Sequence, residues 1–156
     1  MPECVPLIEK VQQTMWSLSA PIIAFPPEGQ TQYYSPDITA EDAKEIDKLH
    51  GLMVENTTIR SEKDSYVVEV AAIQHRTVDT TKTYKGKKVI IEYGKYSQYL
   101  QTSVKHLEKA ITFTHDDVQK EMLRELIKFY ETGDMKHHLE YSKLWVKDAN
   151  PLVETY

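Results

Sequence analysis

Cysteine, glycine and long apolar runs are all scarce in this sequence. Its 156 residues include one cysteine, Cys4, so no disulfide can form within the chain and a reducing compartment is expected. Only five glycines are present, and no glycine-rich phosphate loop occurs among them. No apolar run approaches the length of a membrane span, and the N-terminus lacks a basic region followed by an apolar stretch. We therefore expect a cytoplasmic protein with no membrane partner.

The charge balance narrows the choice of partners. The formal net charge is -5, with 40% hydrophobic and 28% charged residues, as in an ordinary soluble globular protein. An acidic chain has no general attraction to phosphate backbones, so no nucleic-acid partner is expected. The same balance leaves room for cationic partners such as the amino termini of peptides.

Apolar residues at helical spacing predict helices near both ends of the chain. Val5 and Ile8 begin a stripe in a first helix that should stop by Pro21. Thr39 to Asp42 resembles a capping box with Asp in place of Glu, and it opens a helix that Gly51 can end. Three more helical stripes follow, over residues 96–111, 118–130 and 135–146.

The middle of the chain has the composition of strands. Residues 57–60, 66–72 and 88–93 are rich in β-branched and aromatic side chains, whereas the polar stretch 77–83 is expected to be a loop or an edge strand. Residues 152–156 look extended again. This order of helices and strands predicts an α+β fold. Because the last strand would have no partner after it, we expect an incomplete domain.

The residue types that usually form a complete active site do not come together in the sequence. Six histidines are present, but no two have the spacing of H-E-x-x-H. His137 and Glu140 could share a helical face, as could His138 and Ser142, yet two ligands without a third make a weak metal site. There is also no G-x-S-x-G motif. A solvated or half-buried helix surface is the simpler interpretation of these pairs.

Two short motifs allow both a functional and a structural interpretation. Glu131 to Asp134 resembles the E-T-G-E peptide bound by Kelch-type propeller adaptors, but a helix-stopping Gly followed by an Asp cap accounts for all four residues. A lysine-rich stretch could be a nucleic-acid patch or a solvated hairpin turn, and the acidic total favours the turn. Its residues are Lys82, Tyr84, Lys85, Lys87 and Lys88.

Several segments occur in a recognisable order along nearly the whole chain. They are Y-Y-S at 33–35 with E-D-A-K at 41–44, N-T-T-I-R at 56–60 with Y-V-V-E-V at 66–70, L-E-K-A at 107–110, L-W-V-K-D at 144–148 and P-L-V-E-T-Y at 151–156. The last two look like F-W-I-Q-D and G-P-I-V-E-S-Y of the dipeptidyl peptidase III family. In this order and with these gaps, the segments together resemble that family of zinc exopeptidases, which remove dipeptides from free peptide N-termini.

The resemblance implies a parent with two lobes around a wide cleft, one lobe binding peptides and the other carrying zinc. Residues 1–156 then correspond to part of the N-terminal lobe, with helices packed on part of a small, antiparallel-rich β-barrel. The sequence lacks the family's H-E-x-x-x-H helix and its E-E-C-R-x-E-type segment, which supply the zinc ligands and the catalytic Glu. We therefore expect this segment to bind no zinc and to be inactive without the missing catalytic lobe.

Glu154 and Tyr156 are the candidate substrate-binding residues. On a strand, side chains two apart share a face, so Glu154 and Tyr156 would point one way and Val153 and Thr155 the other. A carboxylate beside a phenol suits a peptide ammonium and the adjacent backbone. The resemblance implies that Glu154 holds the substrate's free amino group and that Tyr156 hydrogen-bonds the peptide backbone. Taken alone, the two residues could equally be a solvated carboxylate and a barrel filler.

The sequence thus predicts part of a zinc-dependent dipeptidyl peptidase, a hydrolase whose partners are oligopeptides with a free N-terminus. This segment would contribute peptide binding and not the zinc chemistry. One alternative is a non-catalytic peptide-binding or interaction module derived from that lobe. Another is an independent domain of helices and sheet whose likeness to the family is superficial.

Overall fold

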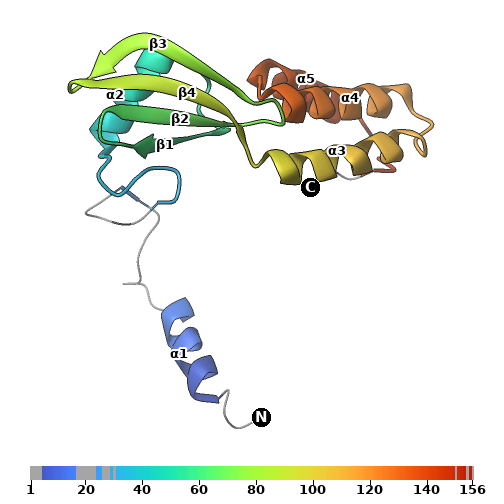
Figure 1. Cartoon of the computed structure of the whole chain (residues 1–156). Helices are drawn as coiled ribbons and strands as arrows, with labels where there is room; N and C mark the ends of the chain where they lie inside the picture. The colour runs from blue at the N-terminus through green and yellow to red at the C-terminus, as the bar shows by residue number, and fades with distance from the viewer. Residues whose placement is uncertain are drawn as a thin grey trace.

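Helices at both ends of the chain flank a four-stranded sheet, which confirms the predicted α+β class (Figure 1). The computed structural model describes residues 5–16, 24–25, 29, 31–149, 151–153 and 155. Its elements are α1 (Val5–Trp16), α2 (Ala40–His50), β1 (Thr57–Ser61), β2 (Ser65–Ala71), β3 (Arg76–Tyr84), β4 (Lys87–Lys95), α3 (Ser97–Ile111), α4 (Asp117–Thr132) and α5 (Met135–Trp145).

The helix ends are set by the capping residues that the sequence predicted. The Thr39 hydroxyl accepts a hydrogen bond from the Asp42 backbone, and the Asp42 carboxylate accepts one from the Thr39 backbone, which completes the capping box of α2. Gly51 and Gly133 end α2 and α4 in the left-handed conformation, with φ of 67° and 69°. The first helix ends at Trp16, and the predicted stop at Pro21 lies outside the described residues.

The sheet has the strand order β1-β2-β4-β3. The β1–β2 and β3–β4 pairs are antiparallel, whereas β2 and β4 run parallel. The polar stretch for which a loop or an edge strand was expected forms β3, at the sheet edge, where few side chains need to be apolar. Within the part of the chain that the structure describes, this sheet is open, so the barrel stays a prediction.

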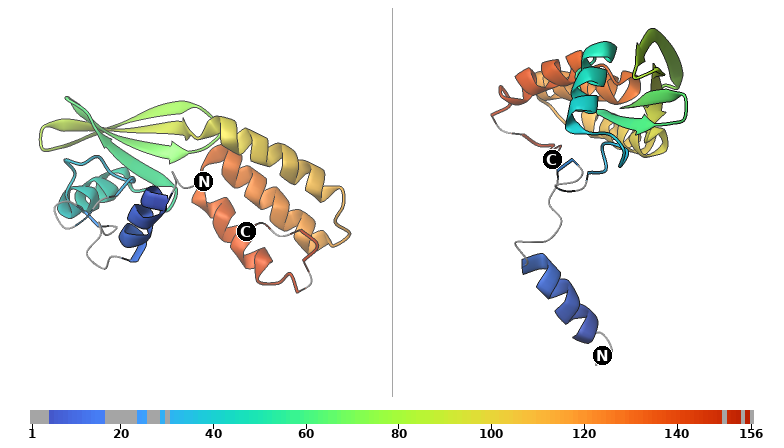
Figure 2. Two further views of the ribbon diagram at one scale, coloured as in Figure 1. Left: turned by 90° about the horizontal axis from the view of Figure 1, so that it is seen from below. Right: turned by 90° about the vertical axis from the view of Figure 1, so that its left-hand side faces the viewer.

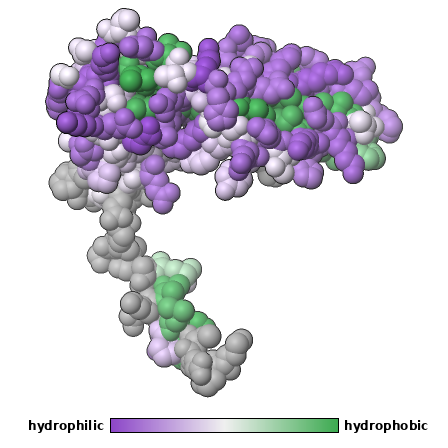
Figure 3. Space-filling model, in the orientation of Figure 1, coloured by the Kyte–Doolittle hydropathy of each residue, from purple (hydrophilic) through white to green (hydrophobic). Residues whose placement is uncertain are grey.

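Two separate cores form, one under the sheet and one among the helices. Alternate side chains of the strands pack on Ile38 and on Ala43 and Ile46 of α2, and together they make a cluster of nine buried residues. The core of the helical bundle formed by α3, α4 and α5 is smaller, with four buried residues: Met122, Leu123, Leu126 and Tyr141. By contrast, α1 lies apart from both cores in Figure 1, and its apolar side chains are exposed, as the green surface in Figure 3 shows.

The end of α4 joins the two cores. The Tyr130 carbonyl accepts a hydrogen bond from the Ile73 backbone at 2.8 Å, and the Asn56 side chain donates to the Gly133 carbonyl at 2.9 Å. A Cβ at Gly133 would lie 2.9 Å from a Val70 methyl group and 3.0 Å from the Ala71 carbonyl oxygen. Glycine is therefore needed there for close approach to β2 as well as for the turn.

Candidate functional site

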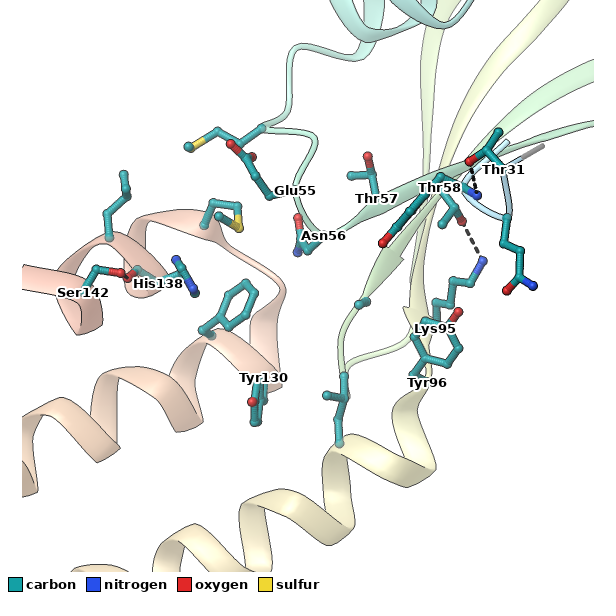
Figure 4. A pocket seen from close by; sticks show the side chains of 18 residues that line it. Thr31, Glu55, Asn56, Thr57, Thr58, Lys95, Tyr96, Tyr130, His138 and Ser142 are labelled. Carbon is teal, nitrogen blue, oxygen red and sulfur yellow. Dashed lines mark hydrogen bonds between the residues drawn. The ribbon is translucent and has the colours of Figure 1, made fainter. Parts of the chain in front are cut away.

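A cavity of about 1030 Å³ lies between the start of β1 and the facing ends of α4 and α5 (Figure 4). Its volume matches the upper range of pockets that hold small molecules or short peptide segments. Aromatic, methionine and leucine side chains make up much of its wall. The lining residues are Thr31, Gln32, Tyr33, Met53, Glu55, Asn56, Thr57, Thr58, Ala71, Lys95, Tyr96, Leu100, Phe129, Tyr130, Met135, His138, Leu139 and Ser142.

On the sheet side of the cavity, the positive charge of Lys95 is already compensated. Its ammonium donates to the Thr58 hydroxyl at 2.6 Å and to the Glu69 carboxylate at 2.8 Å. Burial raises the pKa of Glu69, but Lys95, Thr58 and Arg60 together more than offset this, so the net pKa is lowered and the carboxylate is ionised. Glu69 itself is not among the lining residues. The acidic side chain among them is Glu55, which is exposed. The cavity is therefore apolar with a weakly acidic rim.

On the helix side, His138 connects the cavity to the core of the bundle. Its ring lies 5.1 Å from the Phe129 ring in an edge-on arrangement and 5.7 Å from the Tyr141 ring. The Tyr141 hydroxyl in turn lies 2.6 Å from the Thr155 hydroxyl. Tyr141 therefore contacts both His138, which lines the cavity, and Thr155 near the end of the chain.

The described residues of the C-terminal stretch, 148–155, contact the helices: Asp148 and Val153 contact α4, and Thr155 contacts α5 (Figure 2, left, shows the arrangement of these helices). Gln119 on α4 donates to the Asp148 carboxylate at 2.8 Å and makes a longer contact of 3.5 Å with the Val153 carbonyl. The extended strand predicted for residues 152–156 does not form in the described residues, which bend at 152 and 153, because helix side chains take the place of a neighbouring strand. Glu154 and Tyr156 lie outside the described residues.

Comparison with known proteins places the chain in a family. The family model for peptidase family M49 matches residues 7–156. The chain belongs to peptidase family M49. It is 30% identical over 146 residues to dipeptidyl peptidase 3 of Mus musculus, an alignment that covers 83% of this chain and 20% of that protein. Dipeptidyl peptidase 3 of Dictyostelium discoideum is 25% identical over 152 residues, which cover 94% of this chain and 22% of that protein. The chain thus spans about a fifth of the length of these relatives.

Membership of peptidase family M49 does not bring a metal site into the described residues. No three His, Cys, Asp or Glu side chains converge there. His137 contacts Glu125 of α4 at 2.7 Å instead of pairing with Glu140, which pairs with Lys143. His137 and Glu140 therefore make separate contacts on this helix surface. Each described helix also falls short of the length and hydrophobicity that crossing a membrane needs.

The other two ambiguous motifs also have structural roles. Gly133 ends α4 and the Asp134 carboxylate accepts from the Lys136 backbone at the start of α5, as the structural interpretation required. The lysine-rich stretch is the turn between β3 and β4, and its cations bond within the sheet half. Lys82 donates to the Leu49 carbonyl, and Lys85 donates to the Asp42 carboxylate. Lys87 donates to the Ser61 hydroxyl and the Glu62 carbonyl. Lys88 forms an ion pair with Asp79.

Most of the cavity could not be found from the sequence. Met53, Lys95 and His138 are far apart along the chain, and none belongs to a motif with a chemical function. They meet because the end of α4 docks against β2, and local residue patterns do not show that contact. The polar residues 131–134, between two predicted helices, indicate a sharp turn at that point but not the contact of this turn with β2.

Proposed function

We propose that this chain is part of the peptide-binding lobe of a zinc-dependent dipeptidyl peptidase and that it receives the free N-terminus of oligopeptide substrates. The observation that carries the proposal is the cavity, which Tyr141 connects to Thr155 through His138, in a chain that belongs to peptidase family M49. An apolar wall suits the side chains of a peptide. Similarity to proteins named dipeptidyl peptidase 3 gives the reaction class.

Glu154 is proposed as the acceptor of the substrate's amino group, and Tyr156 as a hydrogen-bonding partner of the peptide backbone. The contact between Thr155 and Tyr141 supports this, because Thr155 lies between the two residues in the sequence and Tyr141 packs on His138, which lines the cavity. A peptide α-amino group has a pKa near 8 and is mostly cationic at neutral pH. A carboxylate about 4 Å away contributes up to roughly 4 kcal/mol at an intermediate effective dielectric, before desolvation reduces it.

The described residues do not fit a catalytic zinc ion, because such a site needs about three protein ligands and none converge among them. In the proposal, zinc and the catalytic lobe belong to a longer cytoplasmic parent, and residues 1–156 form part of its N-terminal lobe. The open sheet would contribute to a small barrel in that parent. The chain alone is proposed to be inactive as a peptidase.

A second candidate function is a peptide-binding or interaction module without catalysis. The cavity favours it, because its wall is built from residues of this chain and binding there requires no zinc. Both candidates predict peptide binding by the chain alone. They differ in whether adding the catalytic lobe of the parent produces dipeptide release.

Calorimetric titration of the purified chain with a tetrapeptide, free or N-acetylated, tests the proposed role of Glu154. We expect acetylation to weaken binding about tenfold or more, since each 1.4 kcal/mol is a factor of ten. Glu154→Gln keeps the shape but removes the charge, so it should abolish that difference. Tyr156→Phe should weaken both peptides about fivefold through one lost hydrogen bond.

Glu55→Gln is the matched control, because it removes the acidic group at the cavity rim and leaves the C-terminal stretch unchanged. It should leave the preference for the free peptide intact. If Glu55→Gln abolishes the preference and Glu154→Gln does not, then the amino group is received at the rim and the role proposed for Glu154 is wrong. Assays of dipeptide release with zinc-loaded chain, alone and with the catalytic lobe, then separate the two candidate functions.

A further inference from the structure

Two buried polar side chains in the core of the bundle have their polar atoms directed at the C-terminal stretch. Gln119 on α4 is 1% exposed and Tyr141 on α5 is 2% exposed. Buried polar groups need hydrogen-bond partners, and burying them without one is unfavourable. The Gln119 amide nitrogen donates to the Asp148 carboxylate and makes a longer contact with the Val153 carbonyl, whereas its buried Oε1 has no partner among the described residues. The Tyr141 hydroxyl bonds the Thr155 hydroxyl.

An apolar residue at either position would fill the bundle without this requirement. The two polar groups are therefore better explained by what they hold than by packing alone. Val153 adds an apolar contact of its own, because its side chain packs against the core cluster of the bundle. Asp148, Val153 and Thr155 are thus tied to α4 and α5 by three polar contacts and one apolar contact.

The anchored positions lie on both sides of Glu154 in the sequence. Val153 precedes it, with its side chain in the bundle core, and Thr155 follows it, with its hydroxyl on Tyr141. We propose that Gln119 and Tyr141 are positioning residues, which fix this stretch so that the acceptor of the peptide amino group is held ready for substrate. This inference rests on the proposed function of Glu154.

If the C-terminal stretch is already ordered in the free protein, substrate binding carries a smaller cost in conformational entropy. Releasing one anchor should therefore weaken the free peptide more than the acetylated peptide, because the acetylated peptide makes no ion pair with Glu154. A loss of about fivefold for the free peptide is expected when one hydrogen bond is removed. A purely structural role would weaken both peptides alike, along with a lower unfolding midpoint.

The experiment removes each side of the Tyr141–Thr155 contact in turn. Tyr141→Phe keeps the ring, Thr155→Val keeps the shape of the side chain, and the double variant should lose no more than either single one. Ser103→Ala is the control, since Ser103 lies on α3 outside the cavity lining and its hydroxyl donates to the Tyr99 carbonyl of its own helix. Gln119→Met tests the other anchor, and Asp148→Ala removes its partner from outside the core if Gln119→Met fails to fold.

The exchange rates of the backbone amides of Val153 and Thr155 measure how firmly the C-terminal stretch is held in the protein without peptide. We expect exchange there to quicken in Tyr141→Phe and Thr155→Val and not in Ser103→Ala, together with the selective loss of free-peptide binding. Unchanged exchange in both variants overturns the inference, and so does an equal loss for both peptides. If the unmodified chain binds free and acetylated peptides alike, the proposed function fails, and the positioning role that depends on it is overturned too.

Discussion

The sheet half and the helical half of the molecule reach their stability by different means. The sheet and α2 share, with Ile38, a cluster of nine buried residues, and ion pairs cross from strand to strand. The bundle has four buried residues at its core and depends on Val153, from beyond its last helix, to help cover them. The helical bundle, which has the smaller core, also carries the C-terminal stretch. The stability of the bundle and the geometry of the candidate site are therefore linked.

The largest effect is expected from Leu123→Ala, which opens a cavity in the thinner core. Leu123 is fully buried, and such a change costs about 2–5 kcal/mol in free energy of unfolding. Urea unfolding followed by circular dichroism measures the loss. Val118→Ala on the same helix is the control, since its exposed position predicts a change below about 0.5 kcal/mol.

Hydrogen exchange in the Leu123→Ala variant tests whether the sheet half and the helical half unfold together. Because the end of α4 is bonded to residues after β2, we expect amides of β2 to lose protection together with amides of α4. Protection lost from α4 alone would show that the two halves open independently and that the junction does not couple them.

Gly133→Ala should weaken the contact between the end of α4 and β2. The substitution places a Cβ at a positive φ, which costs about 1–2 kcal/mol, and presses it against Val70 and Ala71, for a total of about 3 kcal/mol. Gly51→Ala is the matched control, because Gly51 has nearly the same φ and open space around it. Thermal unfolding should rank Gly133→Ala well below Gly51→Ala. Equal losses would mean that the turn alone, and not the close approach, requires glycine at 133.

A smaller effect, dependent on pH, is expected in the sheet half from Asp42→Asn. The Lys85 ammonium, 2.6 Å away, holds the pKa of the Asp42 carboxyl well below its usual range, with help from Thr39 and Tyr84 and against the effect of burial. Because the folded pKa is lowered, the stabilisation is fully present above the usual Asp pKa of about 3.9 and is lost as the pH falls below it.

We therefore expect Asp42→Asn to lower the free energy of unfolding by about 2 kcal/mol at pH 7 and by progressively less below about pH 4. Denaturant midpoints measured across that range test the sign. Asp37→Asn, at an exposed position just before α2, should show neither effect. A constant difference at every pH would mean that the Asp42 charge does not stabilise the sheet half.

Local features of the fold were predictable where a residue type has one structural use. The capping box at Thr39, the stop at Gly133 and the lysine-rich turn all depend on neighbours within a few positions, and all were confirmed. Pairing between distant segments was not predictable in the same way. Nothing in β2 or β4 indicates that they run parallel, because period-2 alternation gives a strand its faces and not its neighbours. The polar composition of β3 did allow an edge strand, which is the place it takes.

The candidate site shows the same division. The sequence singled out Glu154 and Tyr156 through their resemblance to family residues, and these remain predictions. It did not single out Gln119 or Tyr141, since one Gln and one Tyr within helical stripes look like ordinary helix residues. Their role follows from which partner each buried polar group finds, and that depends on the tertiary fold.

The irregular pairing of β3 has a consequence for the behaviour of the protein at high concentration. Between Asp79 and Thr83 the register with β4 shifts, and Thr81 has a positive φ of 59°. Two chains approaching edge to edge could not align hydrogen bonds past this interruption, and the exposed charges beside it repel a second copy. The long outer strand of the sheet is thereby a poor template for the addition of another strand at the β3 edge.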